Sequence, residues 1–457
     1  MLARVTRVIC YATLGLLLQG CIAHKQYRVD YATCEMPPDA GAGGCEKSAL
    51  QRTTNADGSN YLMGFIEFDD QGQLWDRRQM AAVIDTIATQ PRELLMVVFV
   101  HGWKHSAAFD DGNVATFREA MARLSAADAQ VAARNGTASR QVVGVYLGWR
   151  GGSVSLPLAK ELTFWERKNT AQKVGHGSVT EVLSQLESIK ETKNSLIGNE
   201  DTRLVVVGHS FGGAVVYAAI GQLLANRFVN TQGPVGQQST VAGYGDLVVL
   251  INPAFEAMLF ASLSDMSTER GAYFDAQLPV VAVLTSQADD ATKRAFPVGR
   301  WVSTLFEKEH AMVRHNAVTK RDEAINGKAA NLTAVGHFEP YRTHTLTAIA
   351  AQPRQQASAV AEAKQTAEAA LSVSEQWAND RPGSVISFGE TSLNRTQASA
   401  ARNPYIVAYV DEQLIKNHND IDDPRIIAFI EQLIFVSTQP QAQLQRTLES
   451  KKSATPR

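Results

Sequence analysis

One serine in this 457-residue chain lies in a setting where its hydroxyl could act as a nucleophile. Ser210 is the centre of Gly208-His209-Ser210-Phe211-Gly212, a G-x-S-x-G sequence that follows the apolar run 204–207. A serine hydroxyl attacks a carbonyl carbon only when a base takes its proton and an oxyanion site is near. Gly208 and Gly212 permit a strained turn where strand and helix pass too closely for a Cβ. The pattern predicts acyl chemistry at Ser210.

Strand-like and helix-like segments alternate on both sides of this turn. Apolar, β-branched runs predict strands at 94–100, 142–147, 204–207, 247–251, 280–284 and 406–410, and helical patterns occupy 78–89, 116–134, 180–192 and 213–226. Continuous apolar strands suit a parallel sheet that is buried on both faces. The alternation therefore predicts a doubly wound, mostly parallel α/β domain, with its site at the carboxyl ends of the strands. A hairpin-like start at 61–68 predicts antiparallel edge strands.

Two neighbouring carboxylates follow the predicted strand at 280–284, where an acid could orient a catalytic imidazole. They are Asp289 and Asp290. A triad carboxylate must stay ionised, which requires a strand-end position with hydrogen-bond donors. We favour Asp289 as the acid and keep Asp290 as the alternative; capping of the following turn is the non-catalytic interpretation.

Three histidines compete for the role of the base. His418 lies between the predicted strand at 406–410 and a final helix, whose start is marked by Pro424. His344 and His337 lie closer in sequence to the candidate acids. We favour His418, with His344 and His337 as alternatives, and a chain without a catalytic histidine as the remaining interpretation.

The chain from about Gly64 to Val436 resembles the α/β-hydrolase superfamily, especially bacterial esterase- and lipase-like lipoproteins. The segments that carry the resemblance are VFVHGW, VVGVYLGWRG, VVVGHSFGG, LTSQADDATKRAFP and NPYIVAYVDEQLIKNHNDI. The resemblance implies an α/β-hydrolase fold and a catalytic triad of Ser210, Asp289 and His418, in the order that the family uses.

The same resemblance implies how the reaction intermediate would be held. The expected oxyanion hole consists of the backbone N–H groups of Trp103 and Phe211, and His101 is expected to be structural. The implied activity is hydrolysis of carboxylic esters through an acyl-enzyme, without a cofactor or metal. The alternatives are an inactive binding lipoprotein on the same fold, and acyl transfer or amide cleavage by the same triad.

Two stretches are longer than a minimal hydrolase of this kind requires. Residues 153–176 predict either a cap over the serine or an ordinary helix packed on the sheet. Residues 298–402 include the Ala-, Gln- and Glu-rich segment 352–378, which predicts a surface helix or part of a lid. Residues 437–457 predict a polar C-terminal tail.

The first 20 residues have the features of an export signal. Arg4 and Arg7 precede an apolar stretch at 8–18 that is too short to span a bilayer. The sequence Leu18-Gln19-Gly20-Cys21 resembles the lipobox of bacterial lipoproteins. That resemblance implies cleavage before Cys21, lipidation of its thiol, and anchoring in the bacterial cell envelope. Because residue 22 is isoleucine rather than aspartate, the outer membrane is favoured.

The number and positions of the cysteines are those expected of an exported protein. The four cysteines are Cys10, Cys21, Cys34 and Cys45. Cys10 leaves with the signal and Cys21 would carry the lipid, so Cys34 and Cys45 are predicted to form a disulfide in an oxidising compartment. Both lie in the predicted tether at 21–60, ahead of the hydrolase domain at 61–436.

The composition and the net charge indicate which kinds of molecule the protein is expected to bind. The chain is 45% hydrophobic and 20% charged, with a net charge of −2. It can bury a large core, and its charge gives no sign of a nucleic-acid partner. It also lacks P-loop, dinucleotide-binding and HExxH sequences, so we predict no cofactor and no metal. The expected partners are a small-molecule or lipid ester and the membrane that holds Cys21.

Overall fold

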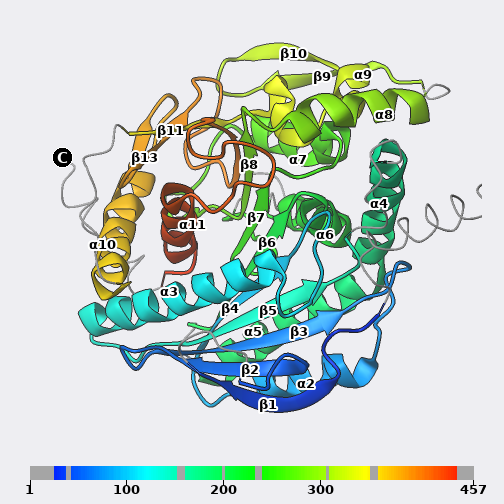
Figure 1. The fold of residues 1–457 in the computed structure, drawn as a ribbon. Helices are drawn as coiled ribbons and strands as arrows, with labels where there is room; N and C mark the ends of the chain where they lie inside the picture. The colour runs from blue at the N-terminus through cyan, green and yellow to red at the C-terminus, as the bar shows by residue number, and fades with distance from the viewer. Residues whose placement is uncertain are drawn as a thin grey trace, which may run out of the picture.

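The protein is described here from a computed structural model that covers residues 25–37, 43–151, 160–197, 201–231, 239–304, 308–349 and 359–439. The predicted signal peptide, Cys21 and most of the predicted C-terminal tail lie outside these ranges. Within them, a twelve-stranded sheet carries helices on both faces (Figure 1). The structure confirms the predicted mixed α/β architecture with a mostly parallel sheet.

The strands are β1 (Asp30–Met36), β2 (Ser48–Thr54), β3 (Asn60–Glu67), β4 (Leu94–Val100), β5 (Gln141–Gly148), β6 (Arg203–His209), β7 (Leu247–Ile251), β8 (Val281–Ser286), β9 (Ala311–Asn316), β10 (Arg321–Asn326), β11 (His344–Ala348), β12 (Val385–Phe388), β13 (Thr391–Arg395) and β14 (Tyr405–Val410). The α-helices are α2 (Arg77–Ala88), α3 (Gly112–Asn135), α4 (Lys160–Val174), α5 (Thr180–Ile197), α6 (Phe211–Asn230), α7 (Ala257–Arg270), α8 (Phe296–Ser303), α9 (Gly327–Leu332), α10 (Ala359–Ala378) and α11 (Pro424–Ser437). Short helical turns of other types are η1 (Gly175–Val179), η2 (Ala291–Ala295), η3 (Val335–His337) and η4 (Glu339–Tyr341).

The strand order in the sheet is β1-β2-β3-β5-β4-β6-β7-β8-β14-β11-β13-β12. The strands from β3 to β11 in this order pair in parallel. Antiparallel pairs occur between β2 and β3 and among the strands beyond β11. All six predicted apolar strands are confirmed as β4, β5, β6, β7, β8 and β14, within two residues at each end.

The N-terminal boundary of the sheet differs from the prediction. The antiparallel pairing expected at 61–68 is confirmed by β2 and β3, but the edge position is wrong, because β3 lies between β2 and β5 in the interior of the sheet. Strands β1 and β2 come from the stretch assigned to a tether, so the sheet begins ahead of residue 61. Both strands are rich in polar and charged residues, so they lack the apolar run that predicts a buried strand.

The stretch 298–402 also differs from the insertion that was predicted. Strands β11, β13 and β12 continue the main sheet beyond β14, while β9 and β10 form a separate hairpin. Residues 359–378 of the Ala-, Gln- and Glu-rich segment form α10, which packs against α3 and α11, and residues 352–358 lie outside the described ranges. Most of this stretch therefore belongs to the main domain.

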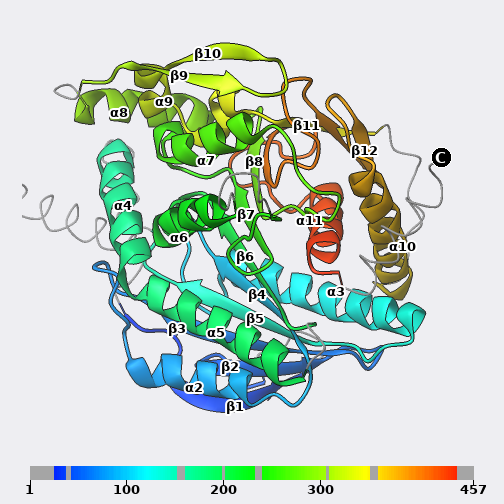
Figure 2. The ribbon, with the colours of Figure 1, turned by 180° about the vertical axis from the view of Figure 1, so that it is seen from behind.

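Each face of the sheet has its own hydrophobic core. Along β4, the side chains of Leu94, Met96, Val98 and Val100 enter one core, and those of Leu95, Val97 and Phe99 enter the other. The first core is covered by α2, α5, α6 and α7, and the second by α3, α10 and α11 (Figures 1 and 2). Because successive side chains of a strand point to opposite faces, burial on both sides requires an uninterrupted apolar run. Each such side chain contributes about 1.5–3 kcal/mol to folding.

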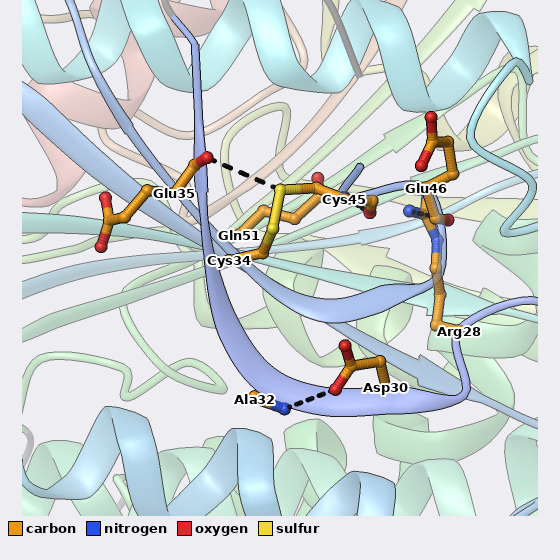
Figure 3. The surroundings of a disulfide bond; sticks show 8 residues. All are labelled: Arg28, Asp30, Ala32, Cys34, Glu35, Cys45, Glu46 and Gln51. Carbon is orange, nitrogen blue, oxygen red and sulfur yellow. Dashed lines mark hydrogen bonds between the residues drawn. A yellow bond between two sulfur atoms is a disulfide. The ribbon is translucent and has the colours of Figure 1, made fainter. Parts of the chain in front are cut away.

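The N-terminal segment is fixed to the body of the protein. A disulfide joins Cys34 and Cys45, as the cysteine usage predicts (Figure 3). The buried guanidinium of Arg28 donates hydrogen bonds of 2.8 Å to the carbonyl oxygens of Ala107 and Glu46. Its backbone N–H donates to the Glu67 carboxylate at 2.8 Å. These contacts join the segment before β1 to β3 and to the loop after β4.

Helix α4 lies in the first stretch that was predicted to be a cap or a packed helix. It packs against α6. Lys168 pairs with Glu256, the residue that precedes α7, and Arg167 pairs with Asp70 at 2.9 Å. These contacts fit a helix packed on the domain, and residues 152–159 lie outside the described ranges.

Candidate active site

The candidate site lies where the strand order changes direction. The chain passes from β4 outward to β5, then returns to place β6 on the other side of β4. At such a switch point the loops after two neighbouring strands diverge, which leaves a crevice at the carboxyl edge of the sheet. Ser210 follows β6, and His101-Gly102-Trp103 follows β4. The sequence motifs chosen for their chemistry therefore meet at one edge.

Ser210 occupies a strained turn between β6 and α6. Its backbone has φ 56° and ψ −121°, in a region that residues other than glycine rarely adopt. A Cβ on Gly212 would lie 2.0 Å from the carbonyl oxygen of Val100, and one on Gly208 would lie 2.8 Å from that of Gly212. The Ser210 N–H donates to the carbonyl oxygen of Ile251 at 2.9 Å, which helps to hold the turn. The two glycines are thus required by the close passage of strand and helix.

The structure brings Ser210, His418 and Asp289 together in one line of hydrogen bonds. Ser210 Oγ lies 2.6 Å from Nε2 of His418, although the two residues are 208 positions apart in the chain. Nδ1 of the same ring lies 2.8 Å from Oδ1 of Asp289. An ionised carboxylate can only accept, so the neutral imidazole carries its proton on Nδ1 and its Nε2 accepts from the serine. This is the protonation state that a general base needs.

Of the three side chains, only the imidazole of His418 is appreciably exposed to solvent. The side chain of His418 is 14% exposed, that of Asp289 is fully buried, and Ser210 is 2% exposed. Burial alone would raise the pKa of Asp289, but its hydrogen bond and attraction to His418 and two hydrogen bonds from Thr292 outweigh that effect. The backbone N–H of Thr292 donates to Oδ1 at 3.1 Å, and its hydroxyl donates to Oδ2. The pKa of Asp289 therefore lies below its ordinary value, and the carboxyl stays ionised.

The alternative candidates lie elsewhere. Asp290 is exposed and pairs with Arg294 at 3.1 Å. His344 is buried in β11, where it contacts the Thr343 hydroxyl at 2.8 Å, and burial lowers its pKa well below the ordinary value. Nε2 of His337 lies 3.0 Å from the hydroxyl of Thr292, whereas the serine hydroxyl contacts His418. The geometry thus favours His418 and Asp289, whose catalytic roles remain predictions.

Sequence reasoning missed two residues that fix the position of His418. Its carbonyl oxygen accepts from Nε2 of His209 at 2.9 Å and from Nδ2 of Asn252 at 3.0 Å. Asn252 follows β7 with a positive φ of 45°, and its Oδ1 accepts from the Ser286 N–H at 2.9 Å. Burial lowers the pKa of His209 to about 3, so this ring is neutral and donates through Nε2. The sequence offered one signal for His209, its place directly before Ser210 in the G-x-S-x-G sequence, and no signal for Asn252.

The predicted oxyanion groups belong to Phe211, which follows Ser210 directly, and to Trp103 in the loop after β4. Phe211 is the first residue of α6, at the end of the helix where N–H groups point outward. Gly102, the residue before Trp103, lies so close that a Cβ there would be 2.7 Å from Ser210 Cβ. Lys104 then turns the chain with a φ of 69°, and its N–H donates to the Gly151 carbonyl oxygen at 2.9 Å.

His101 has the bonding of a structural residue, as predicted. It is fully buried, and its Nε2 accepts from the Trp149 N–H at 3.0 Å. Nδ1 must then carry the proton, and it donates to the Gly102 carbonyl oxygen at 3.0 Å. Burial lowers the pKa of His101 to about 4. Both ring nitrogens are therefore used to join the loops after β4 and β5.

A pair of substitutions separates the two candidate acids. Asp289→Asn is expected to lower kcat by about 10³–10⁴-fold, because an amide facing the ring favours the wrong imidazole tautomer. Asp290→Asn removes the same charge from an exposed neighbour and is expected to change kcat less than about twofold. The measurement is kcat for an activated ester, with circular dichroism to verify folding. Equal losses in both variants would contradict the assignment.

Among the described residues, no group of three or more His, Cys, Asp and Glu side chains is placed to hold a metal ion. Within the same ranges, every helix is too short or too polar to cross a bilayer.

Known proteins show little similarity to this chain. No protein-family model and no curated protein matches the chain. Among solved structures, the chain is similar to phospholipase PlaB from Legionella pneumophila in complex with thio-NAD, with 14% sequence identity and a TM-score of 0.25. The similarity covers 79% of this chain and 62% of the phospholipase chain, so this chain spans less than two thirds of that protein. At this TM-score the similarity carries no argument about the site or its substrate.

Proposed function

We propose that the protein is an α/β-hydrolase that cleaves carboxylic esters with a Ser210–His418–Asp289 triad. The observation that supports this proposal is the continuous hydrogen-bonded line from the serine hydroxyl to a buried carboxylate at the carboxyl edge of the sheet. The strained backbone of Ser210 and the chain order Ser, Asp, His are typical of that superfamily.

The proposed reaction begins with proton transfer from Ser210 to Nε2 of His418. Oγ of the serine bonds to the ester carbonyl carbon, and the N–H groups of Phe211 and Trp103 donate to the resulting oxyanion. Loss of one such donor typically costs about 3 kcal/mol in the transition state. The imidazolium returns its proton to the leaving alcohol as the carbon–oxygen bond breaks. Water then gives a proton to the same ring as its oxygen bonds to the acyl carbon; the bond from that carbon to Ser210 Oγ breaks, the ring returns the proton to Oγ, and the acid leaves.

The lipobox-like sequence supports a location for this activity. We propose that lipidation of Cys21 anchors the protein in the bacterial cell envelope, with the outer membrane favoured. The disulfide between Cys34 and Cys45 is in keeping with an oxidising compartment. The substrates proposed are small-molecule or lipid esters.

A fluorophosphonate probe tests the proposal without knowledge of the substrate. The folded wild-type protein is expected to react covalently at Ser210, since the probe requires an activated serine and an oxyanion site. A panel of p-nitrophenyl esters with graded acyl lengths then measures hydrolysis. A folded wild type that neither reacts with the probe nor hydrolyses any ester would leave the inactive binding protein as the better interpretation. Products that incorporate an added alcohol or amine would instead identify acyl transfer.

A further inference from the structure

A second histidine, His337, is connected to the candidate acid Asp289 through the hydroxyl of Thr292. The hydroxyl of Thr292 donates to Oδ2 of Asp289, and its oxygen lies 3.0 Å from Nε2 of His337. Three separate elements meet here: Asp289 follows β8, Thr292 belongs to η2, and His337 ends η3. The line of hydrogen bonds that starts at Ser210 therefore continues beyond the carboxylate.

Proton positions in this extension follow from the chemistry of the groups. The carboxylate of Asp289 accepts only, so the single hydroxyl proton of Thr292 must point toward it. The Thr292 oxygen then has only lone pairs to offer His337, so Nε2 of that ring must carry a proton and donate. Asp289 thus accepts from His418 through one carboxylate oxygen and from the Thr292 hydroxyl through the other. The Thr292 hydroxyl in turn accepts from His337, which polarises its O–H bond.

The environment of His337 supports one neutral tautomer. Its Nδ1 is shielded from solvent and has no hydrogen-bond partner among the described residues. A proton on that nitrogen would be a buried, unsatisfied donor, which is costly. Burial lowers the pKa of His337 to about 4, in spite of the attraction of Asp289. The ring is therefore neutral near pH 7, with its proton on the nitrogen that faces Thr292.

The backbone of His337 is held firmly in place. Arg342 donates to the carbonyl oxygens of His337 at 2.8 Å and Gly336 at 3.1 Å. A Cβ on Gly336 would lie 1.9 Å from Oγ1 of Thr285, so only glycine permits η3 to approach β8 this closely. The donor to Thr292 is thus preorganised by the fold.

We propose that Thr292 and His337 are positioning residues for the catalytic acid, with His337 fixing the direction of the Thr292 hydroxyl and thereby the orientation and proton affinity of Asp289. The inference rests on the proposed hydrolase function. Loss of the hydroxyl donor concentrates charge on the carboxylate, which then attracts a proton on His418 more strongly. The protonated ring cannot act as a base, so reactivity is lost at a higher pH than in the wild type.

Other charged and titratable groups lie near His418 and His337. The ring centroid of His209, the last residue of β6, lies 5.4 Å from that of His418, and His105 in the loop after β4 acts on His209. Lys293 of η2 and Arg342 act on the His337 side of the carboxylate. The variants chosen below leave all of these groups unchanged, so a shift in pH dependence reports on Thr292 and His337.

The experiment measures the second-order rate of fluorophosphonate labelling between pH 5 and 9 in matched variants. Thr292→Val removes the hydroxyl at constant size, and Thr292→Ser retains it. His337→Leu removes the donor, and His337→Gln retains one. Thr292→Val is expected to react about 10-fold more slowly at the optimum and to shift the acidic limb upward by about 0.5–1 pH unit. His337→Leu is expected to shift the same limb by a smaller amount, while the Ser and Gln variants stay close to the wild type.

The double variant Thr292→Val/His337→Leu provides the decisive comparison. Because His337 acts only through the hydroxyl, adding His337→Leu to Thr292→Val is expected to cause no further loss or shift. Additive effects, or a wild-type acidic limb in Thr292→Val, would overturn the inference while leaving the hydrolase proposal standing. A wild type that does not label would instead refute the proposed function. Thermal unfolding of each variant identifies any that fail to fold.

Discussion

Ser210→Ala is expected to lower kcat for ester hydrolysis by about 10⁵–10⁶-fold, the scale of losses seen when a triad nucleophile is removed. The same variant is expected to lose all fluorophosphonate labelling. Alanine keeps the Cβ and the size of the residue, so the strained turn at φ 56° should survive. The lost function then reflects the missing oxygen, which lies 2.6 Å from the ring that would deprotonate it.

The control for this variant is a serine outside the site. Ser195 is exposed near the end of α5, and Ser195→Ala is expected to hydrolyse and label like the wild type. Both proteins should unfold at similar temperatures. Undiminished activity in a pure sample of Ser210→Ala would remove this serine from the mechanism and refute the proposed chemistry.

His418→Ala is expected to lower kcat by at least ~10³-fold, because no other base contacts the serine hydroxyl among the described residues. The change also leaves the buried carboxylate of Asp289 without the donor that lies 2.8 Å away. Fluorophosphonate labelling should slow in proportion, since the probe depends on the same proton transfer. The measurements are kcat for an activated ester and the rate of labelling.

His344→Ala is the matched comparison. This ring is 1% exposed and lies within β11, so its removal is expected to lower thermal stability while kcat per folded molecule changes little. The reversed result, with kcat lost in His344→Ala and retained in His418→Ala, would move the base to the other histidine. It would also place the reaction away from Ser210.

The parts of this site that are formed by a single turn can be predicted from the local sequence. The run before Ser210 and the glycines around it predict strand, sharp turn and helix, because each requirement is met by neighbouring residues. The six apolar strands were predictable for the same reason, since burial on both faces requires uninterrupted apolar side chains.

The remaining parts depend on contacts between distant segments. Strand β11 has the sequence HTLTA, and only its pairing with β14 and β13 makes it part of the sheet. Asn252 supports His418 through a left-handed backbone conformation that its position after a strand does not reveal. The candidate histidines could be ranked from chain order alone, but only the folded chain separates His418, which meets the serine, from His337, which lies behind the acid.

The anchoring of Arg28 bears on how far this molecule could travel from a bilayer. With the proposed lipid on Cys21, six residue steps lead to Tyr27, whose backbone N–H is already bonded to the Glu67 carboxylate at 2.8 Å. Six fully extended residues reach only about 20 Å. With that anchor, the described part of the chain would begin within about 20 Å of the membrane surface, so the proposed hydrolase would act on esters in the membrane or close to it.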